Sequence, residues 1–88
     1  MSNTQAAFER VRQMASFLGI HVPHPPLLEP RMYGSDEYLF VIELNGTEKE
    51  LRVKVDDMAV SEYYDGSYKF DTDDAWTKLN EFYKAVKS

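Results

Sequence analysis

The chain has 88 residues, of which 43% are hydrophobic and 28% charged, and its formal net charge is −5 at neutral pH. A domain of this size buries about 60% of the surface of its unfolded chain, which provides one modest core and excludes a deep, walled cavity. It has no cysteine, which excludes disulfides and thiolate chemistry, and its acidity argues against direct nucleic-acid binding, because phosphate contacts need Lys and Arg.

Residues 3–18 are predicted to form the first helix, because apolar residues recur at helical spacing along one stripe. The stripe consists of Ala7, Phe8, Val11, Met14, Ala15 and Leu18. Ser2 and Gln5 resemble a capping box at its start. Gly19 suits the left-handed position just past a helix end.

Residues 19–36 hold all four prolines. Proline lacks an amide donor and fixes φ, so this stretch is predicted to be an extended connector and neither a helix nor a central strand. Its apolar side chains, Leu27, Leu28 and Met32, indicate that it packs along the body of the domain.

Glu37–Leu44 and Thr47–Val55 predict a β-hairpin, because Asn45-Gly46 is the strongest signal for a two-residue type I′ turn. This turn would place Leu44 opposite Thr47 and continue in register along both strands. The face that we assign to the core then carries Tyr38, Phe40, Ile42, Leu51, Val53 and Val55. The other face is mostly polar, as expected for a sheet covered on one side.

Two apolar residues, Leu39 and Val41, fall on the nominally wet face of this hairpin, opposite Arg52 and Glu50. Two interpretations remain open. Either the proline-rich connector covers them, or they belong to a secondary contact surface.

A second hairpin is predicted from Met58–Tyr64 and Ser67–Phe70, around the turn signal Asp65-Gly66. The pairing would bring Glu62 opposite Lys69. Alternation is weak in these strands, so the sequence does not indicate which face is buried.

Residues 72–87 predict a C-terminal amphipathic helix that begins at an Asp71 or Thr72 cap. Its stripe consists of Ala75, Trp76, Leu79, Phe82, Tyr83 and Val86. Acids in the first turn and lysines in the last turn agree with the helix dipole.

These elements predict a single α+β domain over residues 1–88, in the order α-β-β-β-β-α. The sheet over residues 37–70 is expected to be an antiparallel meander of four strands, with three strands as the alternative. Both helices should pack on one face, which buries their stripes most economically.

We expect no enzyme, because no catalytic, cofactor or metal motif is present. His21 and His24 are the only histidines, and a metal site needs three or four ligands, so the third would have to come from Glu29, Asp36 or further away. No segment is glycine-rich enough to cradle a phosphate, and no serine has a plausible base. The expected cofactor is therefore none, and the expected metal is none.

The N-terminal stretch carries charges where a signal peptide would have its apolar region. No apolar run approaches the ~20 residues of a membrane span. We expect a cytoplasmic protein without a membrane partner.

Acidity is concentrated between Asp56 and Asp74, where seven acids and one base, Lys69, sum to −6 in a chain of net −5. Helix capping explains Asp71, Asp73 and Asp74, which leaves the acids between residues 56 and 65. A local acidic surface that also carries tyrosines indicates a basic protein partner. The predicted partner-binding residues are Asp56, Asp57, Glu62, Tyr63, Tyr64, Asp65 and Tyr68.

The strand that runs straight into a capped helix over Ser67–Trp76, together with the acidic hairpin Asp56–Asp65, resembles small phage-encoded inhibitors of the anti-CRISPR type. The resemblance implies an inhibitor that occupies a basic, nucleic-acid-binding surface of a partner protein by charge mimicry. It carries over no individual functional residue.

A second interpretation belongs to another class. Type III secretion chaperones are also acidic, helix-flanked meanders, although this chain is shorter than they are and lacks their final strands and helix. That resemblance implies a structural or chaperone-like homodimer, whose working surface would be Leu39, Val41 and the proline-rich arm.

Overall fold

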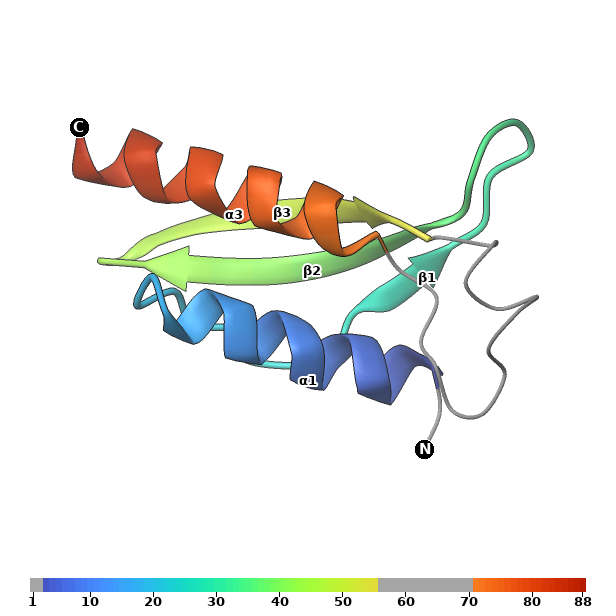
Figure 1. The fold of residues 1–88 in the computed structure, drawn as a ribbon, viewed down its shortest axis with the longest axis horizontal. Coiled ribbons are helices and arrows are strands. Elements are labelled where there is room, and N and C mark those ends of the chain that lie inside the picture. The colour runs from blue at the N-terminus through green and yellow to red at the C-terminus, as the bar shows by residue number, and fades with distance from the viewer. Residues whose placement is uncertain (1–2, 56–70) are drawn as a thin grey trace.

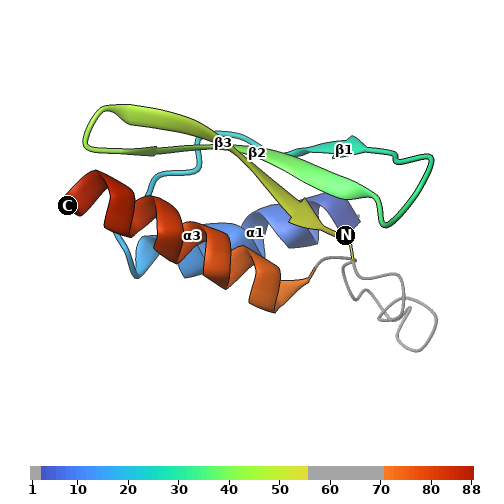
Figure 2. The same ribbon diagram turned by 90° about the horizontal axis from the view of Figure 1, so that it is seen from above.

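The structure is a computed structural model that describes residues 3–55 and 71–88. Its elements are helix α1 (Asn3–Ser16), strands β1 (Leu27–Glu29), β2 (Glu37–Leu44) and β3 (Thr47–Lys54), and helix α3 (Thr72–Lys87). The strands form one antiparallel sheet in the order β1-β2-β3. Both helices lie on the same face of this sheet (Figure 1 and Figure 2), which confirms the predicted α+β class. Neither α1 nor α3 has the length and apolarity needed to cross a membrane.

Helix α1 ends two residues earlier than the sequence pattern predicted, at Ser16 and not at residue 18. The following turn tightens, because the N–H groups of Phe17 and Leu18 bond to carbonyls only three residues back. Gly19 then takes the predicted left-handed conformation with φ +72°. Its N–H bonds to Ser16, and the Ile20 N–H bonds to Ala15 at 3.0 Å, which is the Schellman arrangement.

The proline-rich connector contributes an edge strand to the sheet, which agrees with the exclusion of a helix and a central strand but was not part of the sheet predicted over residues 37–70. Leu27 lies opposite Leu39 and Glu29 opposite Glu37, so β1 is an edge strand beside β2. The same edge is touched earlier by His21, which exchanges two backbone hydrogen bonds with Glu43, at 2.8 and 2.9 Å. Prolines are tolerated here because an edge strand needs donors on one side only.

The side chains that dock this connector differ from those predicted. Ile20, Val22 and Pro26 are buried, whereas Leu27 and Met32 are 69% and 88% exposed. The connector therefore packs along the body as predicted, but the three apolar residues from which this was inferred are not the ones that dock it. The connector is held by its first half and by backbone pairing, and it turns its later apolar side chains outward.

The β2–β3 hairpin has the predicted register, from Leu44 opposite Thr47 to Tyr38 opposite Val53. Asn45 and Gly46 both have positive φ, 53° and 83°, as a type I′ turn requires. All six residues assigned to the core face are at most 5% exposed. The sheet was predicted to span residues 37–70, but the third strand that the structure describes comes from residues 27–29, before the hairpin. The predicted strands Met58–Tyr64 and Ser67–Phe70 lie outside the described residues.

One hydrophobic core lies between the sheet and the two helices. Its largest fully buried side chains are Phe40, Met14, Ile42, Leu79, Val11 and Val53. The predicted stripe of α1 supplies its share of this core, apart from Leu18, which is partly buried. From α3, Ala75, Leu79 and Phe82 are buried, while Trp76, Tyr83 and Val86 pack against the core from its rim.

Helix α3 has the predicted bounds and the predicted cap. Asp71 is extended, and its carboxylate accepts a 3.0 Å hydrogen bond from the Asp74 N–H. Asp73 and Asp74 occupy the first turn, and Lys84 and Lys87 the last. Each charge therefore opposes the adjacent end of the helix dipole.

Candidate functional site

The seven predicted partner-binding residues between Asp56 and Tyr68 lie outside the described residues. The structure does place the two positions that bracket this stretch. The chain leaves the sheet after β3 and returns at Asp71, whose N–H donates a 2.7 Å hydrogen bond to the carbonyl of Lys54. The exit and the return are thus joined by a backbone hydrogen bond at one end of the sheet.

Three acids that follow this stretch have positions that explain their charge. Asp71 caps α3. The Asp74 carboxylate accepts a 3.0 Å hydrogen bond from the Lys54 N–H and pairs with the Lys78 Nζ at 3.0 Å. Asp73 is exposed in the first turn. Their assignment to the helix start is confirmed. The other four acids, Asp56, Asp57, Glu62 and Asp65, lie outside the described residues.

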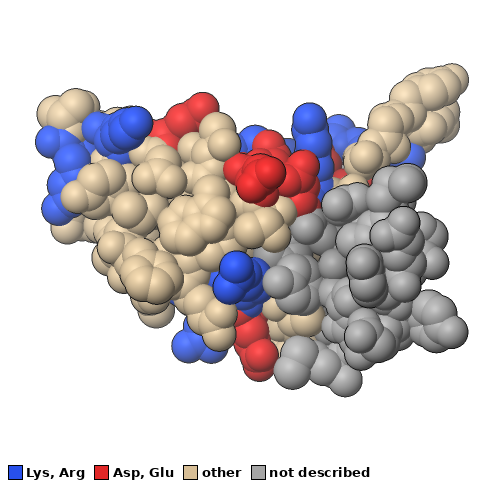
Figure 3. All heavy atoms as spheres, viewed as in Figure 1, with Lys and Arg blue, Asp and Glu red and all other residues tan. Residues whose placement is uncertain are grey.

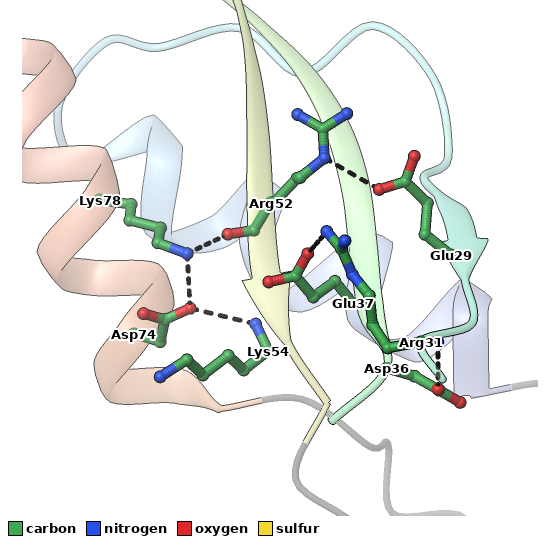
Figure 4. A network of polar contacts seen from close by, with 8 residues as sticks. All are labelled: Glu29, Arg31, Asp36, Glu37, Arg52, Lys54, Asp74 and Lys78. Carbon is green, nitrogen blue, oxygen red and sulfur yellow. Dashed lines mark hydrogen bonds and ion pairs between the residues drawn. The ribbon is translucent and has the colours of Figure 1, made fainter. Parts of the chain in front are cut away.

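The edge of β3 is partly closed by side chains of α3 (Figure 4). Asp74 accepts from the backbone N–H of Lys54, and Lys78 donates its Nζ to the carbonyl of Arg52. These are backbone groups that point away from β2, where an added strand would bind. The helix therefore blocks strand addition along the second half of β3.

The opposite edge of the sheet is blunted by prolines. Because Glu43 bonds to His21 of the connector, the backbone groups of the odd-numbered residues of β2 point toward the connector. Leu27 and Glu29 are the residues of β1 that lie opposite them. The outward positions of the connector are then Pro26, Leu28 and Pro30, two of which lack an N–H. Only Leu28 could donate a backbone hydrogen bond to a further strand over these three positions.

The face of the sheet opposite the helices, here called the outer face, carries the predicted secondary contact residues. Leu39 and Val41 are half-buried there. Directly beside Leu39 lie Leu27 on β1 and Arg52 on β3. The connector thus flanks Leu39 without covering the face, and Leu27 adds an exposed apolar side chain to it.

Two ion pairs lie at the β1 end of the outer face (Figure 4). The Arg52 Nε donates to Glu29 Oε1 at 2.9 Å, across the intervening strand β2, and Arg31 pairs with Glu37. The hydrogen bond to Glu29, and then the charge of Glu29, raise the pKa of Arg52, with smaller contributions from Glu50 and Glu37. Burial opposes this shift. Arg52 therefore stays charged, and its two terminal nitrogens are directed away from Glu29 in Figure 4.

The other end of the outer face is acidic. Glu43 lies directly opposite Glu48, and Glu50 follows two residues along β3. Glu43 accepts a hydrogen bond from the Gly46 N–H of the turn. Over residues 3–55 and 71–88 none of the three glutamates forms an ion pair. The outer face is therefore polarised along its strands, with arginines near one end and unpaired glutamates near the other.

Several exposed apolar side chains lie elsewhere on the surface. Met32 and Tyr33 are 88% and 87% exposed in the loop between β1 and β2, where Gly34 has φ +87°. Phe17 is 80% exposed, and its ring lies 6.3 Å from that of the half-buried Trp76. Much of the helix-bearing face between the two helices carries no charged side chain (Figure 3). Sequence reasoning did not single out Phe17 or Tyr33, although Phe17 lies outside the predicted stripe and Tyr33 precedes a glycine turn.

The chemistry available to the described residues is limited. No three His, Cys, Asp or Glu side chains within residues 3–55 and 71–88 are grouped so that they could hold a metal ion. His21 pairs through its backbone, and the His24 ring lies 3.3 Å from its neighbour's carbonyl at Pro25. Hollows on the described surface, such as the one between Arg31, Tyr33 and Glu37, are open to solvent.

Comparison with family models, with curated proteins and with solved structures finds no match to this chain.

Proposed function

We propose that the chain is a small protein-binding module whose acidic, tyrosine-bearing stretch engages a basic surface of a partner protein. The residues assigned to this contact are Asp56, Asp57, Glu62, Tyr63, Tyr64, Asp65 and Tyr68. A basic surface on a protein is most often one that binds nucleic acid, so the module would act as an inhibitor that occupies such a surface. This is the mode of action implied by the resemblance to anti-CRISPR proteins.

The observation that supports this proposal is the hydrogen bond between Lys54 and Asp71. This bond holds the residues that bracket the acidic stretch, Lys54 before it and Asp71 after it, next to each other at one end of the sheet. The neighbouring acids Asp71 and Asp74 are used in capping and in holding β3. The acids available to a partner are therefore those of the short sequence between Lys54 and Asp71. Closely spaced carboxylates favour electrostatic steering of a basic partner and pairing with its arginines.

The test is a variant in which Asp56, Asp57, Glu62 and Asp65 become the matching amides. It should fold as the parent does and lose most of the partner captured from lysate at low salt. Capture by the parent should also fall steeply as salt is added, because exposed charge pairs are screened. Full capture by the folded variant would refute the proposal.

A matched control neutralises three exposed acids elsewhere on the described surface, Glu9, Asp73 and Glu81. It removes a comparable charge from positions outside the stretch. If capture depends on the stretch itself and not on net charge, this control keeps it.

A further inference from the structure

The outer face of the sheet is polarised in a way that makes it complementary to itself. Its side chains lie in four rows across the strands, as the pairing register defines them. Each row is given in the order β1 or connector, β2, β3. The first row contains Glu29, Glu37 and Lys54, and the second contains Leu27, Leu39 and Arg52. The third contains Val41 and Glu50, and the fourth contains His21, Glu43 and Glu48. Along β3 the order is thus two bases followed by two acids, and along β2 the two central residues are apolar.

We propose that this face is a homodimer interface, in which two copies stack sheet on sheet with their strands running in opposite directions. A twofold axis across the strands, between the second and third rows, carries each row onto its opposite in the other copy. Arg52 then faces Glu50 of the partner subunit, and Lys54 faces the partner's Glu48. Leu39 meets Val41 of the partner subunit at the centre.

The ends of the face match as well. Glu29 comes opposite His21 of the partner subunit, which can donate to a carboxylate. Among these contacts, only Glu37 and the partner's Glu43 carry the same charge. The charge of Glu37 is already neutralised by its ion pair with Arg31. Stacked sheets pack with strands nearly aligned and about 10 Å apart, a distance that these side chains span.

The edges of the sheet favour this mode of self-association over strand addition. The edge of β3 is held by Asp74 and Lys78, and the edge of β1 is interrupted by two prolines. Because Asp74 and Lys78 occupy the outward backbone groups of Lys54 and Arg52, pairing of two β3 edges would be confined to the first half of the strand. Antiparallel pairing there would place Glu48 and Glu50 beside the same two acids of the other copy. The face, unlike the edges, brings opposite charges together.

The size of the face sets the expected strength of the dimer. Four rows about 6.8 Å apart, across three strands about 4.8 Å apart, cover roughly 400 Å² of flat surface in each copy. This lies below the ~800 Å² per partner of a standard interface. We expect a weak dimer with a dissociation constant on the order of 10–100 µM. The inference does not depend on the acidic stretch, so either proposal can fail alone.

Charge swapping tests the arrangement. Glu48 and Lys54 form no ion pair among the described residues, so exchanging their charges leaves the described ion pairs of the monomer intact. By sedimentation equilibrium, Glu48→Lys and Lys54→Glu should each weaken the dimer about tenfold, because each turns two attractive contacts into two repulsive ones. The double variant Glu48→Lys/Lys54→Glu should restore it.

Matched controls carry the same charge changes on α3, away from the outer face. Glu81→Lys and Lys84→Glu should leave the dissociation constant unchanged, and circular dichroism should show that all variants fold. A parent chain that is still monomeric at about 500 µM would overturn the proposal. So would a dimer that is indifferent to the two single changes, or one that the double variant does not restore.

Discussion

The backbone N–H of Lys54 donates a 3.0 Å hydrogen bond to the carboxylate of Asp74, twenty residues further along the chain. A single side chain in the first turn of α3 thereby completes the backbone bonding of β3. The same carboxylate pairs with Lys78, which in turn reaches the carbonyl of Arg52. The helix is fastened to the strand by polar contacts at its start and by Leu79 and Phe82 further on.

Asp74→Ala should lower the free energy of unfolding by about 1–2 kcal/mol, because it leaves the Lys54 N–H without its partner and removes a charge-assisted bond. Urea denaturation followed by circular dichroism measures this change. Asp73→Ala is the matched control, since Asp73 is exposed in the same turn and sees the same helix dipole. Its cost should stay near 0.5 kcal/mol. Equal losses in the two variants would show that only the dipole matters.

Asp71→Ala should cost about 1 kcal/mol through loss of the helix cap, and Asp71→Asn should recover most of it, because the asparagine oxygen can accept the same N–H of Asp74. Thermal unfolding of the two variants side by side provides the comparison. If alanine and asparagine proved equally destabilising, the loss would come from the charge of Asp71 and not from its capping bond.

Gly19→Ala should destabilise the fold by about 1 kcal/mol, because the position has φ +72° and a side chain there is strained. A Cβ added at Gly19 would meet no heavy atom within 4 Å, so crowding does not contribute. Gly19→Asn should lose less than Gly19→Ala, since asparagine tolerates the left-handed region better. Chemical denaturation of the three proteins gives the ranking, and an alanine variant as stable as the parent would contradict the Schellman end.

Leu79→Ala should cost about 2–5 kcal/mol, because the side chain is fully buried between α3 and the sheet and its removal leaves a cavity. That loss is a large share of the stability of a domain of this size. Val86→Ala, at the rim of the same helix, should cost less. Both values come from denaturant titration, and a reversed order would mean that α3 is packed through its last turn.

The double change Met32→Ser/Tyr33→Ser should leave the free energy of unfolding within about 0.5 kcal/mol of the parent, because both side chains stand almost fully in solvent. Thermal and urea unfolding measure it. A large loss would show that the loop between β1 and β2 contacts the rest of the protein more closely than its exposure indicates.

Local rules were sufficient for the elements whose signals are local. Asn45-Gly46 set the register of β2 and β3, Gly19 marked the end of α1, and Asp71 marked the start of α3. Alternation along β2 and β3 then assigned Tyr38 and its neighbours to the core. Asn45, Gly46 and Gly19 favour the positive φ that they adopt, and Asp71 supplies the side-chain oxygen that caps α3.

The position of β1 could not be predicted in this way. Prolines argue against a central strand, but the choice between a free connector and an edge strand depends on where the connector lies in space. Between the His21–Glu43 bridge and the Leu27–Leu39 pair, the connector advances six residues while β2 advances four. The two extra residues mean that the connector does not stay paired with β2 along its whole length, so the sequence holds no continuous strand pattern from residue 21 to residue 29. The polarity of the outer face is equally non-local, because it appears only when the rows across the strands are assembled.

The hydrogen bond between Lys54 and Asp71 has a consequence for how this domain can change over evolution or by design. Because the N–H of Asp71 bonds to the carbonyl of Lys54, the spacing between the end of β3 and the start of α3 is short enough for a tight turn to connect them. Replacing residues 56–70 by a short glycine-containing turn would therefore ask whether β3 and α3 keep their places without the native sequence between them. If they do, other recognition sequences could be grafted at this position and compared, as variable loops are on the constant sandwich of antibody domains.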